Sequence, residues 1–272
     1  MNTNWINNVF VSMVDASKRI RPALWRWVYN HIAARDTSGK FLFMNYGFDS
    51  AVSTPLILKE ADEPYRYYIQ LYEHVVADIS LQGKCVAEVG CGRGGGGSYL
   101  IRYHNPASYT GVDLSEKAIA WCQRQHALDI ATWLQGRADA LPLQDNSVDV
   151  VVNVESSHCY PSMENFLNEV KRVLRSQGYF SFCDMRRLAE IPLLENVMKN
   201  SGLRIVKQQE ITKEVLQALD HVSAERDASI AAVFPKMFRG VFRDFAAVKD
   251  TAIYAMLQKG EMKYFSYLLQ KE

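Results

Sequence analysis

The chain has 272 residues, of which 48% are apolar and 22% are charged; this ordinary globular composition excludes a disordered, collagen-like or disulfide-framework protein. The 31 basic and 30 acidic residues leave a formal charge of +1, so the chain lacks the net basic footprint of a nucleic-acid binder. The five cysteines form no CxxC pair and no signal peptide is visible, so we expect a cytoplasmic location.

The N-terminal part is basic and aromatic. Residues 1–40 carry six basic side chains against two acidic ones, with tryptophans between them. Their periodicity predicts an amphipathic helix over residues 5–34, interrupted near Pro22. Such a helix can pack on the core as a lid, or it can make peripheral contact with a membrane or a lipid substrate. An aromatic loop follows at residues 41–48, and helical spacing of apolar residues predicts a helix over residues 63–82.

From residue 84 onward, short β-branched runs alternate with helical patterns. This alternation indicates βαβ units on a parallel sheet. We therefore expect an α/β, Rossmann-like fold with a seven-stranded, mostly parallel sheet, helices on both of its faces, and N-terminal and C-terminal helical lid segments. The predicted strands span residues 84–89, 108–113, 132–136, 148–154, 179–184, 203–210 and 262–270. The predicted helices span residues 96–104, 115–126, 163–174, 188–200 and 212–230.

A long helical stretch, residues 211–260, lies between the last two predicted strands. Five of its apolar side chains recur at helical spacing. Such a stripe suits either core packing or the lining of an apolar substrate pocket. These side chains are Phe234, Phe238, Val241, Phe242 and Phe245.

A cluster of glycines follows the predicted strand 84–89. Six of the 15 glycines lie within residues 90–97. Glycines there allow a positive φ and let a ligand approach the backbone, and the next helix N-terminus offers unpaired N–H groups. The crevice at the carboxyl ends of parallel strands is where such folds bind ligands. The sequence therefore predicts a ligand site at this loop.

The next predicted strand ends on an acidic residue. Asp113 lies 23 residues after Gly90, where a carboxylate can accept hydrogen bonds from both hydroxyls of a ribose. The alternative interpretation is a cap for the helix that follows Ser115. Two nucleotide cofactors fit this layout, because Gly90-x-Gly92-x-x-Gly95 also satisfies the dinucleotide fingerprint of an NAD enzyme.

Three further features favour S-adenosylmethionine (SAM) over NAD. Glu88 lies two residues before the first glycine, where an acid can help hold the amino-acid end of SAM. Asp139 follows the third predicted strand and can bond to the adenine amino group. Residues 145–151, which read D-N-S-V-D-V-V, then open the fourth predicted strand.

Taken in order, these landmarks resemble those of the class I SAM-dependent methyltransferases. The match continues through residues 169–178, where Ser176-Gln177 stands in place of the usual Pro-Gly before Gly178. From about residue 40 to the end, the chain is similar to the lipid O-methyltransferases of the phthiotriolone and phenolphthiotriolone type. The segments that carry this likeness are residues 43–47, 62–64, 94–99, 106–113, 153–161 and 260–264.

The resemblance implies methyl transfer from SAM to a hydroxyl or carboxyl oxygen of an apolar lipid, polyketide or related secondary metabolite. It divides the chain into an N-terminal helical lid (1–82), a SAM-binding core (83–210), a helical substrate cap (211–260) and a last core strand (261–272). It also implies a set of cofactor-binding residues, namely Tyr46, Glu88, Gly90, Gly92, Gly94, Asp113, Leu114, Asp139, Ala140 and Asn153.

The segment after the fourth predicted strand holds the candidate catalytic residues. His158 has a side chain suited to proton transfer at neutral pH, and its other interpretations are a packed or substrate-contacting histidine and a metal ligand. Glu155 can orient His158, contact the cofactor or act as the base itself. The other histidines show no metal-ligand spacing, so no metal site is expected.

Other functions stay open at this stage. They are C- or N-methylation of a small natural product, SAM binding without methyl turnover, and NAD-dependent oxidoreduction, which leaves Asp139 unexplained.

Overall fold

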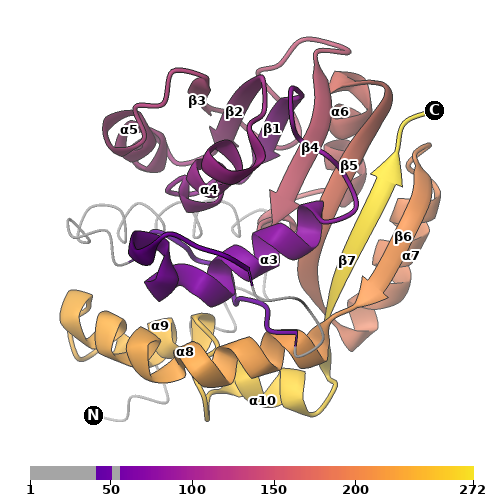
Figure 1. Cartoon of the computed structure of the whole chain (residues 1–272). Helices are drawn as coiled ribbons and strands as arrows, with labels where there is room; N and C mark the ends of the chain where they lie inside the picture. The colour runs from indigo at the N-terminus through magenta and orange to yellow at the C-terminus, as the bar shows by residue number, and fades with distance from the viewer. Residues whose placement is uncertain (1–40, 51–55) are drawn as a thin grey trace.

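The computed structural model describes residues 41–50 and 56–272 (Figure 1). The helix expected over residues 5–34 lies outside these ranges. The described chain forms one seven-stranded sheet in the order β3-β2-β1-β4-β5-β7-β6, in which β7 alone runs antiparallel to its neighbours. Its strands are β1 (Cys85–Val89), β2 (Ser108–Asp113), β3 (Ala131–Gln135), β4 (Val148–Val154), β5 (Leu174–Arg187), β6 (Arg204–Glu210) and β7 (Met262–Gln270). The predicted mostly parallel α/β fold is confirmed.

The central strands are apolar on both sides because helices cover both faces of the sheet. On β4, Val150 and Val152 belong to one core cluster and Val151 to the other. The first cluster includes residues of α3 (Arg66–Val76), α4 (Gly95–His104) and α5 (Glu116–Gln125), and the second includes residues of α6 (Met163–Val173) and α7 (Ile191–Lys199).

Two elements differ from the expectation. The helix expected over residues 63–82 begins as a 3-10 helix (Glu60–Tyr65) and ends at Val76, where a turn from Ile79 N–H to Val76 O directs Leu81 into the core. Strand β5 is longer than expected because it pairs with β7 all the way to Arg187.

The turn within β5 is made without the usual Pro-Gly. Gln177 adopts a φ of +63° at this point, a conformation that costs a non-glycine residue free energy. Its backbone N–H donates to Lys271 O and its side-chain oxygen accepts from Gln270, so the C-terminal strand holds this turn in place.

Three helices lie between β6 and β7, namely α8 (Thr212–Val233), α9 (Arg239–Phe245) and α10 (Ala252–Gln258). In Figure 1, α3 lies between this group and α4. The group has its own apolar cluster, in which the rings of Phe234 and Phe242 stack with centroids 3.7 Å apart. None of the described helices is long and apolar enough to cross a membrane.

The strand order reverses between β1 and β4: β2 and β3 continue to one side of β1, and β5 follows β4 on the other. At such a switch point the loops leave in opposite directions and open a crevice at the carboxyl ends of the strands. The glycine loop after β1 and the segment after β4 both begin at this crevice.

Candidate active site

The glycine loop packs closely against its surroundings. Gly90 has a φ of +79°, and a Cβ atom there would overlap Ser156. Farther along, a Cβ atom on Gly96 would overlap the ring of Tyr72, and one on Gly97 would overlap the ring of Tyr109. The run of glycines therefore serves two purposes: it makes the turn, and it leaves room for two tyrosines beneath the turn.

These two tyrosines bind the acid of the glycine motif. Glu88 is fully buried and accepts hydrogen bonds from Tyr72 Oη (2.7 Å) and from Tyr109 Oη. Burial raises the pKa of Glu88 to about 7, although both tyrosine hydroxyls act to lower it. The sequence placed Glu88 in contact with a cofactor, whereas the structure places its carboxyl group behind Tyr72, outside the pocket lining.

A large pocket opens at the carboxyl ends of β1, β2 and β4. It encloses about 1430 Å³, its open mouth included, and we call it the reaction pocket. Eight of the twelve site residues expected from the sequence line it, namely Tyr46, Gly90, Gly92, Asp113, Leu114, Asp139, Glu155 and His158. The four that do not are Glu88, Gly94, Ala140 and Asn153.

Asp113 is held in place from two sides. Its Oδ2 accepts from Gly92 N–H (2.9 Å) and its Oδ1 from Ser115 N–H (2.8 Å). Burial raises the pKa of Asp113, against these two bonds, which lower it. Ser115 itself caps α5 through its side chain, so Asp113 is not the helix cap. Its carboxyl group lines the pocket with lone pairs left for a ligand.

Asp139, which follows the neighbouring strand β3, also lines the pocket and forms a two-pronged ion pair with Arg137, at 2.8 and 2.7 Å. This pair holds the pKa of Asp139 below its usual range.

Asn153 connects the two sides of the crevice. Its side-chain N–H group donates to Val89 O (2.7 Å), Ser156 Oγ (2.8 Å) and Tyr160 Oη (3.0 Å). It therefore ties the end of β1 to the segment after β4 and sits behind the pocket wall.

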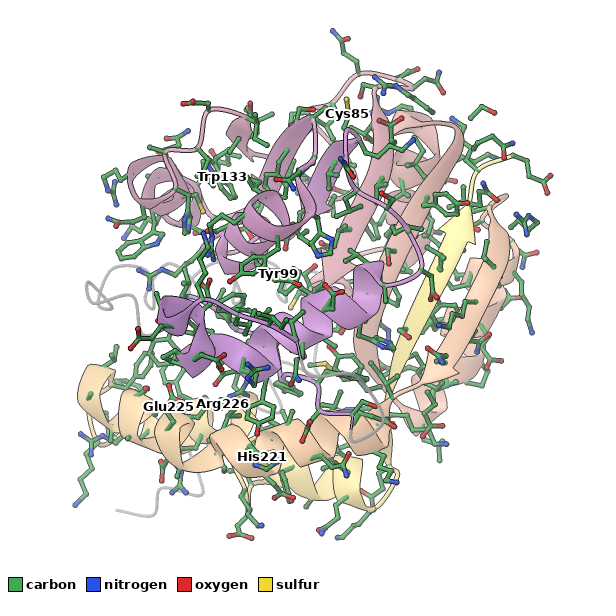
Figure 2. All side chains as sticks on the ribbon, viewed as in Figure 1. Cys85, Tyr99, Trp133, His221, Glu225 and Arg226 are labelled. Carbon is green, nitrogen blue, oxygen red and sulfur yellow. The ribbon has the colours of Figure 1, made fainter. Side chains whose placement is uncertain are left out.

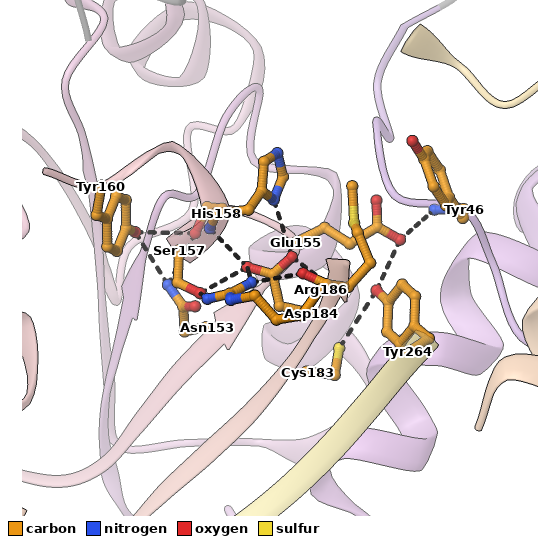
Figure 3. A network of polar contacts seen from close by, with 12 residues as sticks. Tyr46, Asn153, Glu155, Ser157, His158, Tyr160, Cys183, Asp184, Arg186 and Tyr264 are labelled. Carbon is orange, nitrogen blue, oxygen red and sulfur yellow. Dashed lines mark hydrogen bonds and ion pairs between the residues drawn. The ribbon is translucent and has the colours of Figure 1, made fainter. Parts of the chain in front are cut away.

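Glu155 joins three distant parts of the chain (Figure 3). Its Oε1 accepts from the backbone N–H of Tyr46 (2.5 Å) and from Tyr264 Oη (2.7 Å). Its φ is +46°, a left-handed conformation that is costly for a non-glycine residue. Burial raises the pKa of Glu155 to about 7, although Tyr264 and Tyr46 act to lower it.

His158 is paired with a carboxylate that the sequence reasoning missed. His158 Nδ1 lies 2.8 Å from Asp184 Oδ1, and its backbone N–H donates to Asp184 Oδ2 (2.9 Å). Asp184 also accepts from Ser157 Oγ and forms an ion pair with Arg186 (Figure 3). Asp184 therefore binds the Nδ1 side of the ring, and His158 lines the reaction pocket.

The charges of this pair support each other. Burial acts to lower the pKa of His158, but Cys159 and Asp184 raise it, and the net pKa lies well above its usual value. Burial acts to raise the pKa of Asp184, yet His158 and Arg186 hold it below its usual range. Asp184 fixes the ring orientation of His158 and favours its protonated form.

Asp184 could have been found from the sequence. It ends the predicted strand 179–184 just as Asp113 ends the strand 108–113, and the rule that singled out Asp113 applies equally to it. Within residues 41–50 and 56–272, no three histidine, cysteine or acidic side chains are grouped so as to hold a metal ion.

The chain matches the model of the methyltransferase domain over residues 87–182. It is 38% identical over 249 residues to the phthiotriol/phenolphthiotriol dimycocerosates methyltransferase of Mycobacterium tuberculosis, which covers 92% of each chain. It is 36% identical to the fatty-acid O-methyltransferase of Mycolicibacterium smegmatis, over 90% of this chain and 88% of that one. Among solved structures, a cyclopropane synthase of Mycobacterium tuberculosis is similar, with a TM-score of 0.66, 15% identity and coverage of 89% and 98%.

The raised pKa of Glu88 predicts a pH-dependent stability. The folded pKa is about 7 and the unfolded one about 4.5, so the folded state binds the proton more tightly. The stability that this proton brings is complete below pH 4.5 and is lost as the pH rises toward 7 and beyond. Glu88→Gln removes the titration, so the variant should gain stability relative to the parent chain between pH 5 and 8, by up to about 3 kcal/mol.

Urea unfolding of both chains at several pH values measures this difference. A difference in unfolding free energy that stays constant from pH 5 to 8 would mean that Glu88 is ionised in the folded protein.

Proposed function

The chain belongs to the class I SAM-dependent methyltransferases, and from this premise we propose that it methylates a hydroxyl or carboxyl oxygen of an apolar lipid or related metabolite. The relatives named for phthiotriol dimycocerosates and for fatty acids support this acceptor class. The observation that carries the proposal is that one pocket combines the glycine loop and Asp113 with the paired His158.

The described residues fit SAM. The glycine loop gives a wall without side chains, and Asp113 presents a buried carboxyl group to the hydroxyls of a ribose. Asp139, held by Arg137, faces the adenine side. We propose that Gly90, Gly92 and Leu114 complete this cradle, because they line the reaction pocket together with Tyr46. Four further predicted residues do not line the pocket and would support this cradle without touching the cofactor, namely Glu88, Gly94, Ala140 and Asn153.

The chemistry needs alignment more than activation. SAM supplies, when bound, a sulfonium methyl group that an acceptor oxygen can take directly. The protein's part is to hold the acceptor in line and to exclude water. The loop at residues 41–48 contributes to this, because Tyr46 is tied to Glu155 through its backbone and to Phe245 O through its hydroxyl (2.9 Å).

We propose that His158 handles the acceptor's proton. Asp184 orients the ring of His158, which lines the reaction pocket, and a histidine positioned by a carboxylate suits the role of a general base. Glu155 is the second candidate, since its pKa of about 7 also suits proton transfer. Its oxygen Oε1 is already committed to Tyr46 and Tyr264, which favours a positioning role.

The division of the chain follows from the same proposal. Residues 83–210 and 261–272 would bind SAM, whereas residues 211–260 and the N-terminal lid 1–82 would cover the acceptor. The proposed membrane contact concerns residues 1–40, which lie outside the described ranges.

The ribose assignment predicts that Asp113→Asn lowers the affinity for S-adenosylhomocysteine at least about tenfold, since hydrogen bonds to a charged acceptor contribute about 1.5–3 kcal/mol each. Calorimetric titration measures this. Asp139→Asn serves as the control and should lose less, because its charge is already satisfied by Arg137. Unchanged affinity in Asp113→Asn would remove the ribose role.

The proton-transfer role predicts a pH dependence that Asp184 controls. With a hydroxyl acceptor, kcat/KM should rise as the pH rises through the raised pKa of His158, because only the neutral imidazole accepts a proton. Asp184→Asn removes the charge that raises this pKa, so the rise should move to lower pH. With a carboxyl acceptor, which is already ionised, the imidazolium is the useful form and the rate should fall through the same range.

His158→Gln should abolish either pH dependence and lower kcat while leaving the affinity for S-adenosylhomocysteine near that of the parent. If the profile survives in His158→Gln and disappears in Glu155→Gln, then Glu155 is the base.

A further inference from the structure

A second cavity lies beside the reaction pocket, between the loop at residues 41–48 and the helices α8 and α9. It encloses about 600 Å³ with its mouth included, and we call it the cap cavity. Its lining is dominated by aromatic and aliphatic side chains, among them Phe41, Ile230, Phe234 and Phe242.

The two cavities share a wall. Phe43, Met44 and Phe245 line both of them. Polar contacts of Tyr46 hold this shared wall in place. The hydroxyl group of Tyr46 donates to Phe245 O, and its backbone N–H donates to Glu155. Two aromatic side chains and one flexible methionine side chain therefore lie at the boundary between the reaction pocket and the cap cavity.

The turn that carries His158 also reaches the cap. Cys159, the next residue, packs against the apolar cluster of Ile230, Phe234 and Phe242. Cys159, which also lines the reaction pocket, thus connects the turn that carries His158 with the apolar cluster of the cap.

Two charged residues line the cap cavity, namely the exposed Glu225 and the buried Arg226. Arg226 is buried and donates from Nε to Tyr68 Oη (3.2 Å), from one terminal nitrogen to Ala246 O (2.6 Å) and from the other to Asn45 O. It lies between α8 and α3 (Figure 2). Each nitrogen of Arg226 already has an acceptor, and nine of the twelve lining residues are apolar or aromatic, so the cavity suits an apolar chain.

We propose that the cap cavity holds the apolar chain of the acceptor while the oxygen to be methylated lies in the reaction pocket. This inference rests on the proposed function, and it assigns the binding of the acceptor's apolar chain to the cap cavity. The acceptor class it selects is an amphiphile with one polar end and a long saturated chain. Phe43, Met44 and Phe245 form the passage between the two parts.

Straight-chain fatty acids from octanoate to hexadecanoate, titrated into the protein loaded with S-adenosylhomocysteine, test the proposal by calorimetry. Affinity should rise about fourfold for each added methylene group that becomes buried. Ser229→Trp narrows the cap cavity from α8, where Ser229 is partly exposed and lines it. This variant should bind hexadecanoate at least about tenfold more weakly and octanoate unchanged.

Ala228→Trp is the matched control, because Ala228 is the neighbouring residue on α8 and faces solvent. It should bind the whole series as the parent does. Ala246→Leu, which narrows the same cavity from the end of α9, should repeat the effect of Ser229→Trp. Thermal unfolding and the affinity for S-adenosylhomocysteine report whether each variant is folded.

If both narrowing variants bind hexadecanoate like Ala228→Trp, the chain does not lie in the cap cavity and the proposal is overturned. Methyl transfer to the same acceptors is measured in parallel. This measurement distinguishes a failure of the chain-binding subsite from a failure of the proposed O-methylation. Chain-length-dependent binding that the narrowing variants weaken, without transfer to any acceptor, would support the subsite and contradict the proposed O-methylation.

Discussion

The carboxyl group of Glu155 is the point on which the arrangement of the site depends. It follows the central strand β4 in a left-handed backbone conformation, and it binds the N-terminal loop through Tyr46 and the last strand through Tyr264. Such strain costs about 1–3 kcal/mol and persists only where the surroundings fix it. Because Tyr46 is bound in turn to Phe245 O, the cap, the loop and the sheet meet at this one side chain. Removing the carboxyl group of Glu155 would remove the hydrogen bonds that hold the loop at residues 41–48, which forms part of the wall shared by both cavities.

Buried acids lie at or near the carboxyl ends of three neighbouring strands, and the protein stabilises them in two ways. Glu88 and Glu155 are bonded by tyrosine hydroxyls, and burial raises the pKa of both to about 7. Asp184 instead has two cationic partners and stays ionised. A charge is stable in a buried site only where it is paired. The negative charge of Asp184 therefore lies next to His158, where it can orient the ring and adjust its proton affinity.

The sequence predicted the sheet well because β-branched runs between helices are a local signal. Six strands lie within one residue of their predicted bounds, whereas β5 extends beyond the predicted residues 179–184 at both ends. The sequence also placed Asp113, Glu155 and His158 on one pocket, since strand ends meet at the same edge. It did not reveal that Tyr72 and Tyr109 bind Glu88, because these tyrosines come from other parts of the chain. Asp184 was overlooked although its position at a strand end was visible. The cap cavity depends on contacts between Phe41 and residues far along the chain, which no local pattern reveals.

The central claim is that an oxygen atom of an apolar acceptor receives the methyl group. The most direct measurement incubates the purified protein with isotopically labelled SAM and a mixed panel of long-chain alcohols and fatty acids, and identifies the labelled product by mass spectrometry. The account predicts a methyl ether or a methyl ester formed together with S-adenosylhomocysteine. A labelled methyl group on carbon or nitrogen, or tight S-adenosylhomocysteine binding with no labelled product across the panel, would contradict it.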